Sequence, residues 1–275
     1  KVEAHVNAGG QKVVYPCTIG EARYALKVIE VPPITSEEDE ANRESIQLRV
    51  RREIEIMREI ENPHLVRPGP MGLDQISIGG TDYFCFTEEW IDGQDLAQIC
   101  QAAGSLEVSD CLGMASEVNG VIGELWDRSF LHRDISMKNV MRRDSGDYVL
   151  IDLGYAFDFL GVSLTQHPGP PGTLHYMAPE RFDLSKKREL DHRSDQFSLG
   201  VVTFAALTGQ HPYFVTGMSG DEYVHELCNG SSVPAAPSSL TASEVAPAVD
   251  RFIIRLVSRH RHMRFPSCTA VQREI

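Results

Sequence analysis

One stretch, residues 131–154, constrains this chain most, because it carries three hard oxygen ligands at fixed spacing. It reads LHRDISMKNVMRRDSGDYVLIDLG. Asp134 is followed by Asn139, and Asp152 closes a short apolar run. Carboxylates and a carboxamide suit Mg2+, which keeps several waters and takes one or two protein carboxylates together with substrate phosphates. The spacing from Asp134 to Asn139 also occurs in ordinary turns, so its meaning depends on what accompanies it along the chain.

Composition excludes several classes of protein. A length of 275 residues suits one or two domains with a real core. The net charge of -13 argues against a nucleic-acid partner, which needs a basic face. No apolar run approaches the length of a membrane span, and no signal peptide is visible. The chain begins with Lys1 rather than Met, so we expect flanking segments or a regulatory partner outside it.

The six cysteines are scattered without a C-x-x-C pair. This spacing predicts reduced thiols in a cytoplasmic protein rather than a disulfide framework or a zinc site.

The N-terminal part of the chain predicts strands. Residues 1–31 contain strand-forming runs on both sides of a glycine turn, and residues 71–96 contain a second strand pair around Gly79 and Gly80. Between them, residues 35–61 predict a long helix that Thr35 or Ser36 caps. Its apolar residues recur at helical spacing and form one face: Ile46, Val50, Ile54, Met57 and Ile60.

The C-terminal part predicts helices. Residues 106–130 form an amphipathic pattern, with Ser109 as the expected cap. A second helix is expected to begin at Ser194 and to end at Gly209. Residues 230–248 are rich in Ser, Pro and Ala and predict a loop without chemical signal.

Four motifs in order resemble the eukaryotic-type protein kinase domain, and the resemblance covers essentially the whole chain. They read H-R-D-x-x-x-x-N, D-L-G, G-T-x-x-Y-M-A-P-E and S-D-x-x-S-x-G. The resemblance implies an α+β, bilobal fold with a small antiparallel β-rich lobe over residues 1–90 and a larger, mainly helical lobe over residues 91–275. It also implies that ATP and Mg2+ bind between the lobes.

The resemblance also implies catalytic roles. Asp134 would accept the proton of the attacking hydroxyl, and Asn139 and Asp152 would bind Mg2+. Lys27, in the run Y-A-L-K, would anchor the phosphates. Glu53 would pair with Lys27, with Glu55 and Glu59 as competitors for that role. Each of these charges could instead belong to a solvated surface.

A further set of residues would bind the nucleotide: Gly9, Gly10, Val14, Ala25, Lys27, Glu89, Ile91, Asp95 and Met141. Glu89 and Ile91 would offer backbone groups to the adenine, and Asp95 would accept from the ribose hydroxyls. Asp95 is equally well placed to cap the helix that follows it. Glu88 would stand behind the adenine as gatekeeper, which requires either a buried partner for its carboxylate or a register shifted by one residue.

The glycine-rich loop departs from the family pattern G-x-G-x-x-G-x-V. Asn7, Gly9 and Lys12 stand at its three glycine positions, and taken alone this loop reads more readily as a plain hairpin. Lys12 would add positive charge near the phosphates.

The catalytic loop departs as well. Ser136 replaces the lysine usual in serine/threonine kinases, and Lys138 would offset the developing charge in its place.

The segment from Asp152 to Glu180 resembles an activation segment with Ser163, Thr165 and Thr173 as candidate phosphosites, although each is equally a solvated hydroxyl. Thr173 would contact Asp134, and Arg133 suggests control by a phosphorylated segment. The resemblance further pairs Arg264 with Glu180 and makes Asp195 a brace for the catalytic-loop backbone.

These features predict a serine/threonine protein kinase that acts on protein substrates, itself included. Two alternatives stay open. A pseudokinase that binds nucleotide as a scaffold would explain the poor glycine loop and Ser136, whereas the set of Lys27, Asp134, Asn139 and Asp152 argues against it. A small-molecule kinase is disfavoured by the A-P-E segment.

Overall fold

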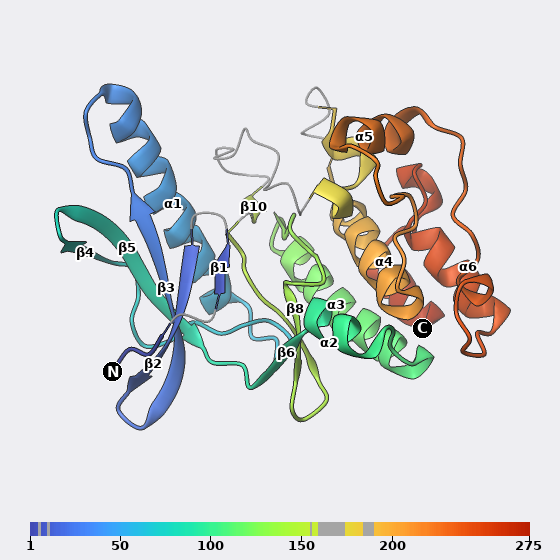
Figure 1. The fold of residues 1–275 in the computed structure, drawn as a ribbon, viewed down its shortest axis with the longest axis horizontal. Helices are drawn as coiled ribbons and strands as arrows, with labels where there is room; N and C mark the ends of the chain where they lie inside the picture. Colours follow the sequence, from blue (N-terminus) through green and yellow to red (C-terminus); the bar gives the residue numbers. More distant parts are fainter. Residues whose placement is uncertain (5–6, 10–11, 155, 159–173, 184–189) are drawn as a thin grey trace. The chain divides into compact units, whose positions relative to one another are not determined.

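The computed structural model describes residues 1–275 apart from 5–6, 10–11, 155, 159–173 and 184–189 (Figure 1). The chain divides into two units. The first comprises Lys1–Asp92 and Asp152–Gly154, and the second comprises Gly93–Ile151 and Tyr155–Ile275. The short piece around Asp152 therefore belongs with the N-terminal unit although it is distant in sequence.

The first unit is built on a five-stranded antiparallel sheet in the order β1-β2-β3-β5-β4. Its strands are β1 (Asn7–Gly9), β2 (Lys12–Ile19), β3 (Ala22–Val31), β4 (Asp74–Ile78) and β5 (Thr81–Glu89). The predicted turn at Gly79 and Gly80 joins β4 to β5, and both glycines adopt positive φ values that other residues rarely tolerate. In the register of β3 with β5, Ala25 lies opposite Glu88 and Lys27 lies opposite Phe86.

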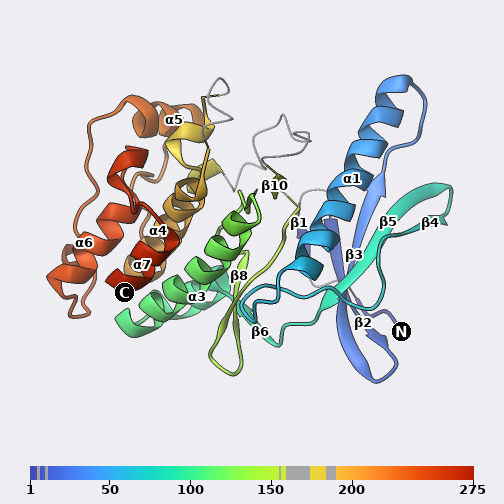
Figure 2. The ribbon, with the colours of Figure 1, turned by 180° about the vertical axis from the view of Figure 1, so that it is seen from behind.

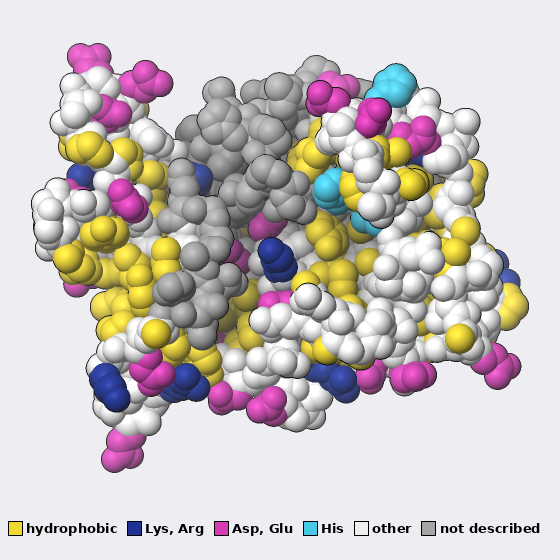
Figure 3. Space-filling model, in the orientation of Figure 1, with side chains coloured by type: hydrophobic (Ala, Val, Ile, Leu, Met, Phe, Trp, Pro, Cys, Tyr) yellow, Lys and Arg dark blue, Asp and Glu magenta, His cyan; other side chains and the backbone are white. Residues whose placement is uncertain are grey.

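The predicted long helix is α1 (Glu37–Glu59), and it lies along one face of the sheet (Figure 1). Ser36 caps it by accepting a hydrogen bond from the Asp39 backbone N–H at 3.2 Å. The predicted apolar face is buried in full: Ile46, Val50, Ile54, Met57 and Ile60. Figure 3 shows acidic side chains gathered over the start of α1, where the partial positive charge of the helix N-terminus favours them.

The second unit is mainly helical. Its helices are α2 (Leu96–Ala103), α3 (Val108–Asp127), α4 (His192–Thr208), α5 (Gly220–Asn229), α6 (Pro247–Leu256) and α7 (Cys268–Glu274). α4 is buried along almost its whole length, with α3 and α6 packed against it and α7 packed against α3 (Figure 2). Gly200 permits the close approach of α6, because a Cβ atom there would lie 2.6 Å from Cβ of Leu256.

Two small sheets of the second unit hold the loop that contains Asp134. β7 (Phe130–Leu131) precedes the loop and pairs with β10 (Phe157–Asp158). β8 (Val140–Arg143) follows the loop and lies between β6 (Gly93–Asp95) and β9 (Tyr148–Leu150). Both ends of the loop are therefore fixed by strand pairing.

The predicted α+β organisation, with a strand-rich first part and a helical second part, is confirmed. Two predicted helix caps are wrong. Ser109 lies inside α3, where Glu107 takes the cap position, and Ser194 lies inside α4, where the Asp191 carboxylate accepts from the Arg193 backbone N–H. The predicted end of α4 at Gly209 is correct, with φ of 68° in the left-handed region.

Within the described part of the chain, no helix combines the length and the apolar character needed to cross a membrane. Each of the six cysteines is a free thiol.

Candidate active site

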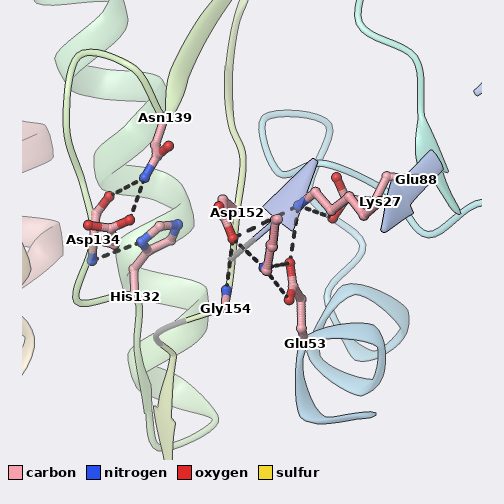
Figure 4. Close-up of polar contacts among 9 residues, drawn as sticks. Lys27, Glu53, Glu88, His132, Asp134, Asn139, Asp152 and Gly154 are labelled. Atoms are coloured by element: carbon pink, nitrogen blue, oxygen red, sulfur yellow. Dashed lines mark hydrogen bonds and ion pairs between the residues drawn. The ribbon is translucent and has the colours of Figure 1, made fainter. Parts of the chain in front are cut away.

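Lys27 lies in a buried cluster with carboxylates of the first unit (Figure 4). Its ammonium is 2.7 Å from Oε1 of Glu88 and 3.1 Å from Oε1 of Glu53. The strand register explains the first contact, because Glu88 is the diagonal neighbour of Lys27 on the same face of the sheet. Glu53 comes from α1, where it faces the sheet and is 1 % exposed. The structure thus brings Glu53 to Lys27, whereas Glu55 and Glu59 are exposed.

Lys12 joins the same cluster. Its ammonium lies 2.8 Å from Oε2 of Glu53 and 2.8 Å from Oδ1 of Asp152. Lys12 reaches this place because Val14 lies opposite Lys27 in the sheet, and residues two apart on a strand share a face. Gly154 leaves room for the lysine tip, since a Cβ atom there would be 2.4 Å from Nζ of Lys12.

Asp152 completes the cluster. Its Oδ1 accepts a hydrogen bond from the Gly154 backbone N–H at 3.1 Å and lies 3.9 Å from Nζ of Lys27. Burial would raise the pKa of Asp152, but Lys12 and Lys27 hold it well below its usual range. Asp152 therefore carries a full negative charge at neutral pH, which a cation ligand requires.

Burial has a different outcome for the other ionisable groups. Burial alone would lower the pKa of Lys27. The negative charges of Glu88, Glu53 and Asp152 outweigh this effect, so the pKa lies above its ordinary value. Burial raises the pKa of Glu88, Lys27 lowers it and Glu53 raises it again, with a net value of about 7. Glu88 is thus far more easily protonated than Asp152.

Sequence reasoning left two readings of Glu88, and the structure decides between them. Glu88 is 3 % exposed and has Lys27 as its buried partner, so no register shift is needed. Sequence reasoning missed the contacts of Lys12 with Glu53 and Asp152. The available signal was the two-residue period of β2, which places Lys12 on the same face as Val14, the residue opposite Lys27.

Asp134 lies in the second unit, in the loop between β7 and β8 (Figure 4). Asn139 Nδ2 donates to Oδ2 and to the backbone carbonyl of Asp134, both at 2.7 Å. The structure therefore brings together the two residues that define the loop motif. Lys138 is exposed beside them, and Ser136 is buried.

Asp195 of α4 holds the start of this loop. Its carboxylate accepts from the backbone N–H groups of His132 at 2.8 Å and Arg133 at 2.9 Å. Arg133 adopts φ of 66°, a left-handed conformation that is costly outside glycine. The predicted brace is thus present, and it acts where the backbone is strained.

The end of the A-P-E motif is tied down within the second unit. Arg264 donates to Oε1 of Glu180 at 2.7 Å and to Oε2 at 3.0 Å, as predicted, and its side chain is fully buried. Arg181 donates to the Arg133 carbonyl. Burial and the charge of Arg133 lower the pKa of Arg181 to about 10. Arg133 and Arg181 therefore lie close to the carboxylates of Asp134 and Asp195.

The predicted nucleotide residues fall in both units. Val14 and Ala25 lie on the same face of β2 and β3 as Lys27. The N–H of Glu89 donates to the Arg67 carbonyl at 2.9 Å, so any adenine contact of Glu89 would fall to its own carbonyl. Ile91 is buried.

In the second unit, Asp95 lies opposite Met141 in the pairing of β6 with β8. Asp95 caps α2 through a capping box with Gln98, as the structural interpretation predicted.

Some predictions lie outside the described residues. These are Gly10, Ser163, Thr165 and Thr173, together with the contact of Thr173 with Asp134. Gly9 is described as part of the β1–β2 hairpin, opposite Lys12.

The residues present fit Mg2+ bound together with phosphates. The Asp152 carboxylate already holds a cation, the Lys12 ammonium, and its side chain is 28 % exposed. Nδ2 of Asn139 is committed to Asp134, so its carboxamide oxygen is the candidate ligand atom. Within the described residues, no group of three or more His, Cys, Asp or Glu side chains is arranged to hold a metal by itself. Mg2+ commonly takes one or two protein carboxylates together with substrate phosphates.

The family model described as protein kinase domain matches residues 1–274. The chain is 27 % identical over 244 residues to the probable serine/threonine-protein kinase PknB of Bifidobacterium longum. This match covers 86 % of this chain and 34 % of that protein. It is 22 % identical over 274 residues to the serine/threonine-protein kinase PrkC of Bacillus subtilis, covering 98 % and 39 %. It is 29 % identical over 195 residues to the serine/threonine-protein kinase pkn3 of Myxococcus xanthus, covering 68 % and 35 %. The chain thus spans between a third and two fifths of the length of these relatives.

Proposed function

Because the chain belongs to the protein kinase domain family, which implies ATP as phosphoryl donor, we propose that it phosphorylates Ser or Thr hydroxyls of protein substrates, itself included. The relatives described above are named serine/threonine-protein kinases, which supports the choice of Ser and Thr. The observation that carries the proposal is the buried Lys27–Glu53 ion pair, whose ammonium lies 3.9 Å from Oδ1 of Asp152.

The residues of the site have distinct tasks in this reaction. Lys27 binds phosphate oxygens, and Glu53 is a positioning residue because it holds the Lys27 ammonium. Asp134 orients the acceptor hydroxyl and takes its proton, while Asn139 keeps the Asp134 carboxylate in place. Lys138 is exposed and offsets charge on the transferred group, since Ser136 carries none. Asn139 and Asp152 would hold Mg2+, which would supply positive charge to neutralise the phosphates.

The A-P-E segment supports a protein substrate over a metabolite. The Glu180–Arg264 ion pair fixes its end, and Ser198 of α4 donates to the Tyr176 carbonyl at 2.7 Å. A segment held in this way offers a rigid surface to which a peptide can bind. We place the domain in the cytoplasm, where ATP is abundant and where free thiols such as these stay reduced.

The test is a substrate screen with radiolabelled ATP and Mg2+. We expect label on Ser and Thr residues of a generic protein substrate and of the chain itself, with the modified positions mapped by mass spectrometry. Label on tyrosine alone, or on a metabolite but no protein, would contradict the proposed substrate class. ATP binding without any transfer would instead favour a scaffold that binds nucleotide without turnover.

A further inference from the structure

We propose that Lys12 is a second phosphate-binding lysine, made necessary because Glu88 holds Lys27. The inference rests on the proposed function, since it concerns how the same nucleotide is bound. Its basis is the division of two ammonium groups among three carboxylates in the first unit: Glu53, Glu88 and Asp152.

The side chains of the two lysines differ in how exposed they are. The side chain of Lys27 is 6 % exposed, and its shortest contact, 2.7 Å, is with Glu88. The side chain of Lys12 is 20 % exposed, and its ion pairs in the cluster are with Glu53 and Asp152. Because a ligand can approach an exposed ammonium more readily than a buried one, Lys12 is the more available cation.

Lys12 is also the closer lysine to Asp152. Its ammonium is 2.8 Å from Oδ1 of Asp152, compared with 3.9 Å for the ammonium of Lys27. It shares both oxygens of Glu53, at 3.0 and 2.8 Å. Lys12 therefore contacts Glu53 and Asp152, the two carboxylates beside which the phosphates are proposed to bind.

Charge balance gives the reason for a second lysine. With all groups ionised, two lysines and three carboxylates leave the cluster with one net negative charge. Glu88 adds a carboxylate directly against Lys27 and so cancels the charge that would otherwise attract phosphate. Without Lys12, one lysine would face three carboxylates with a net charge of two negative units, so Lys12 halves the negative charge that a polyanionic ligand meets.

A small space lies beside the tip of the Lys12 side chain. A small pocket of about 40 Å³ borders Lys12, Glu53 and Gly154. It is far too small for a nucleotide, but it gives the end of a flexible side chain room to rearrange.

The test compares ATP with adenosine, which carries no phosphate. Binding to Lys12→Met is measured by calorimetry in EDTA, so that metal does not contribute, and then with Mg2+. We expect the affinity for ATP to fall about tenfold or more in both conditions while the affinity for adenosine stays within twofold. Lys12→Arg should recover most of the loss. Arg43→Met, which removes a half-buried ion pair with Asp82 in the same unit, is the matched control and should bind both ligands normally.

A double variant tests the role given to Glu88. In a Glu88→Gln background Lys27 is released, so Lys12→Met should cost less than about threefold in ATP affinity. A loss shared equally by ATP and adenosine, or no loss of either, would show that Lys12 only neutralises buried carboxylates.

Wild-type protein supplies an independent measurement if Lys12→Met does not fold. We expect ATP, but not adenosine, to slow acylation of the Lys12 amine by an amine-reactive reagent by at least about threefold, as read by mass spectrometry. Equal protection by both ligands, or by neither, would overturn the role of Lys12. The proposed function fails separately, through absence of phosphoryl transfer in wild type, whereas the Lys12 proposal fails through an unaltered preference for ATP in the variant.

Discussion

Glu88 is an ionisable side chain at a buried position of the sheet. A carboxyl group is buried at a place in the sheet where an apolar side chain would cost nothing, and it is retained there by a 2.7 Å contact with Lys27. Its pKa of about 7 means that its ionised form is costly in the folded protein. Glu88 therefore makes both the stability and the degree to which the Lys27 charge is neutralised depend on pH.

This pKa predicts the direction of a stability change. A carboxyl group whose pKa is higher in the folded than in the unfolded protein binds more protons when folded, so the free energy of unfolding falls as pH rises between the two values. Wild type should lose on the order of 1 to 3 kcal/mol from this group between pH 4.5 and 7. Glu88→Gln removes that loss, so its melting temperature relative to wild type should rise between pH 5 and pH 8.

The control for this measurement is Glu55→Gln, at an exposed glutamate on α1. Its melting temperature should follow that of wild type at every pH. A constant difference between Glu88→Gln and wild type across this range would mean that Glu88 does not titrate there.

At the scale of elements, Arg264 links three parts of the second unit. Its guanidinium binds Glu180 in the A-P-E segment and donates to the carbonyls of Arg193 in α4 and Ser258 after α6. The side chain is completely buried, so its charge is stable only with these partners.

Arg264→Met should lower the free energy of unfolding by about 3 to 5 kcal/mol, because it leaves the Glu180 carboxylate without its partner. Denaturant titration measures the change. Arg128→Met is the control, since its contact with Glu124 is exposed and 4.0 Å long, and it should cost less than about 1 kcal/mol. Equal losses in the two variants would refute the anchoring role of Arg264.

His211 is the second link at this scale. Nδ1 accepts from the backbone N–H groups of Tyr213 at 3.1 Å and Phe214 at 2.8 Å, so the proton lies on Nε2, which donates to the His175 carbonyl at 2.7 Å. Burial lowers the pKa of His211 to about 4. The ring must stay neutral to keep these bonds.

A histidine with a lowered pKa costs stability as pH falls, because the unfolded chain takes up a proton that the folded chain refuses. From pH 6.5 to pH 4, wild type should lose on the order of 3 kcal/mol through His211. His211→Gln should flatten this slope, whereas His225→Gln, at an exposed position on α5, should leave it as it is. Denaturant titrations across this pH range decide the matter, and parallel slopes for His211→Gln and wild type would contradict the assignment.

Across the whole molecule, local patterns predicted the elements and the motifs well, because both depend on residues close in sequence. The long helix α1 and its buried face followed from helical spacing, and Asp134 with Asn139 followed from a short motif. Helix caps were harder to predict, because several polar residues near the start of a helix can each accept a hydrogen bond from a backbone N–H. Asp191 therefore took the place expected for Ser194.

Contacts between distant residues were harder to predict. Lys12 and Asp152 are 140 positions apart in the chain, and their ion pair depends on strand register and on the space that Gly154 leaves. The motif pattern placed Lys12 at a glycine position and predicted positive charge near the phosphates, but not its contacts with Glu53 and Asp152. The family comparison identifies the domain, but such chain-specific contacts come from the packing of these particular side chains.

The central claim is that this domain transfers phosphate from ATP and that Asp134 is needed for the transfer rather than for binding. The most direct measurement is a single-turnover transfer of labelled γ-phosphate in wild type and in Asp134→Asn, with ATP affinity determined in the same samples. We predict that Asp134→Asn binds ATP within about threefold of wild type and loses at least a hundredfold in transfer rate. Equal transfer rates in the two proteins would contradict the account.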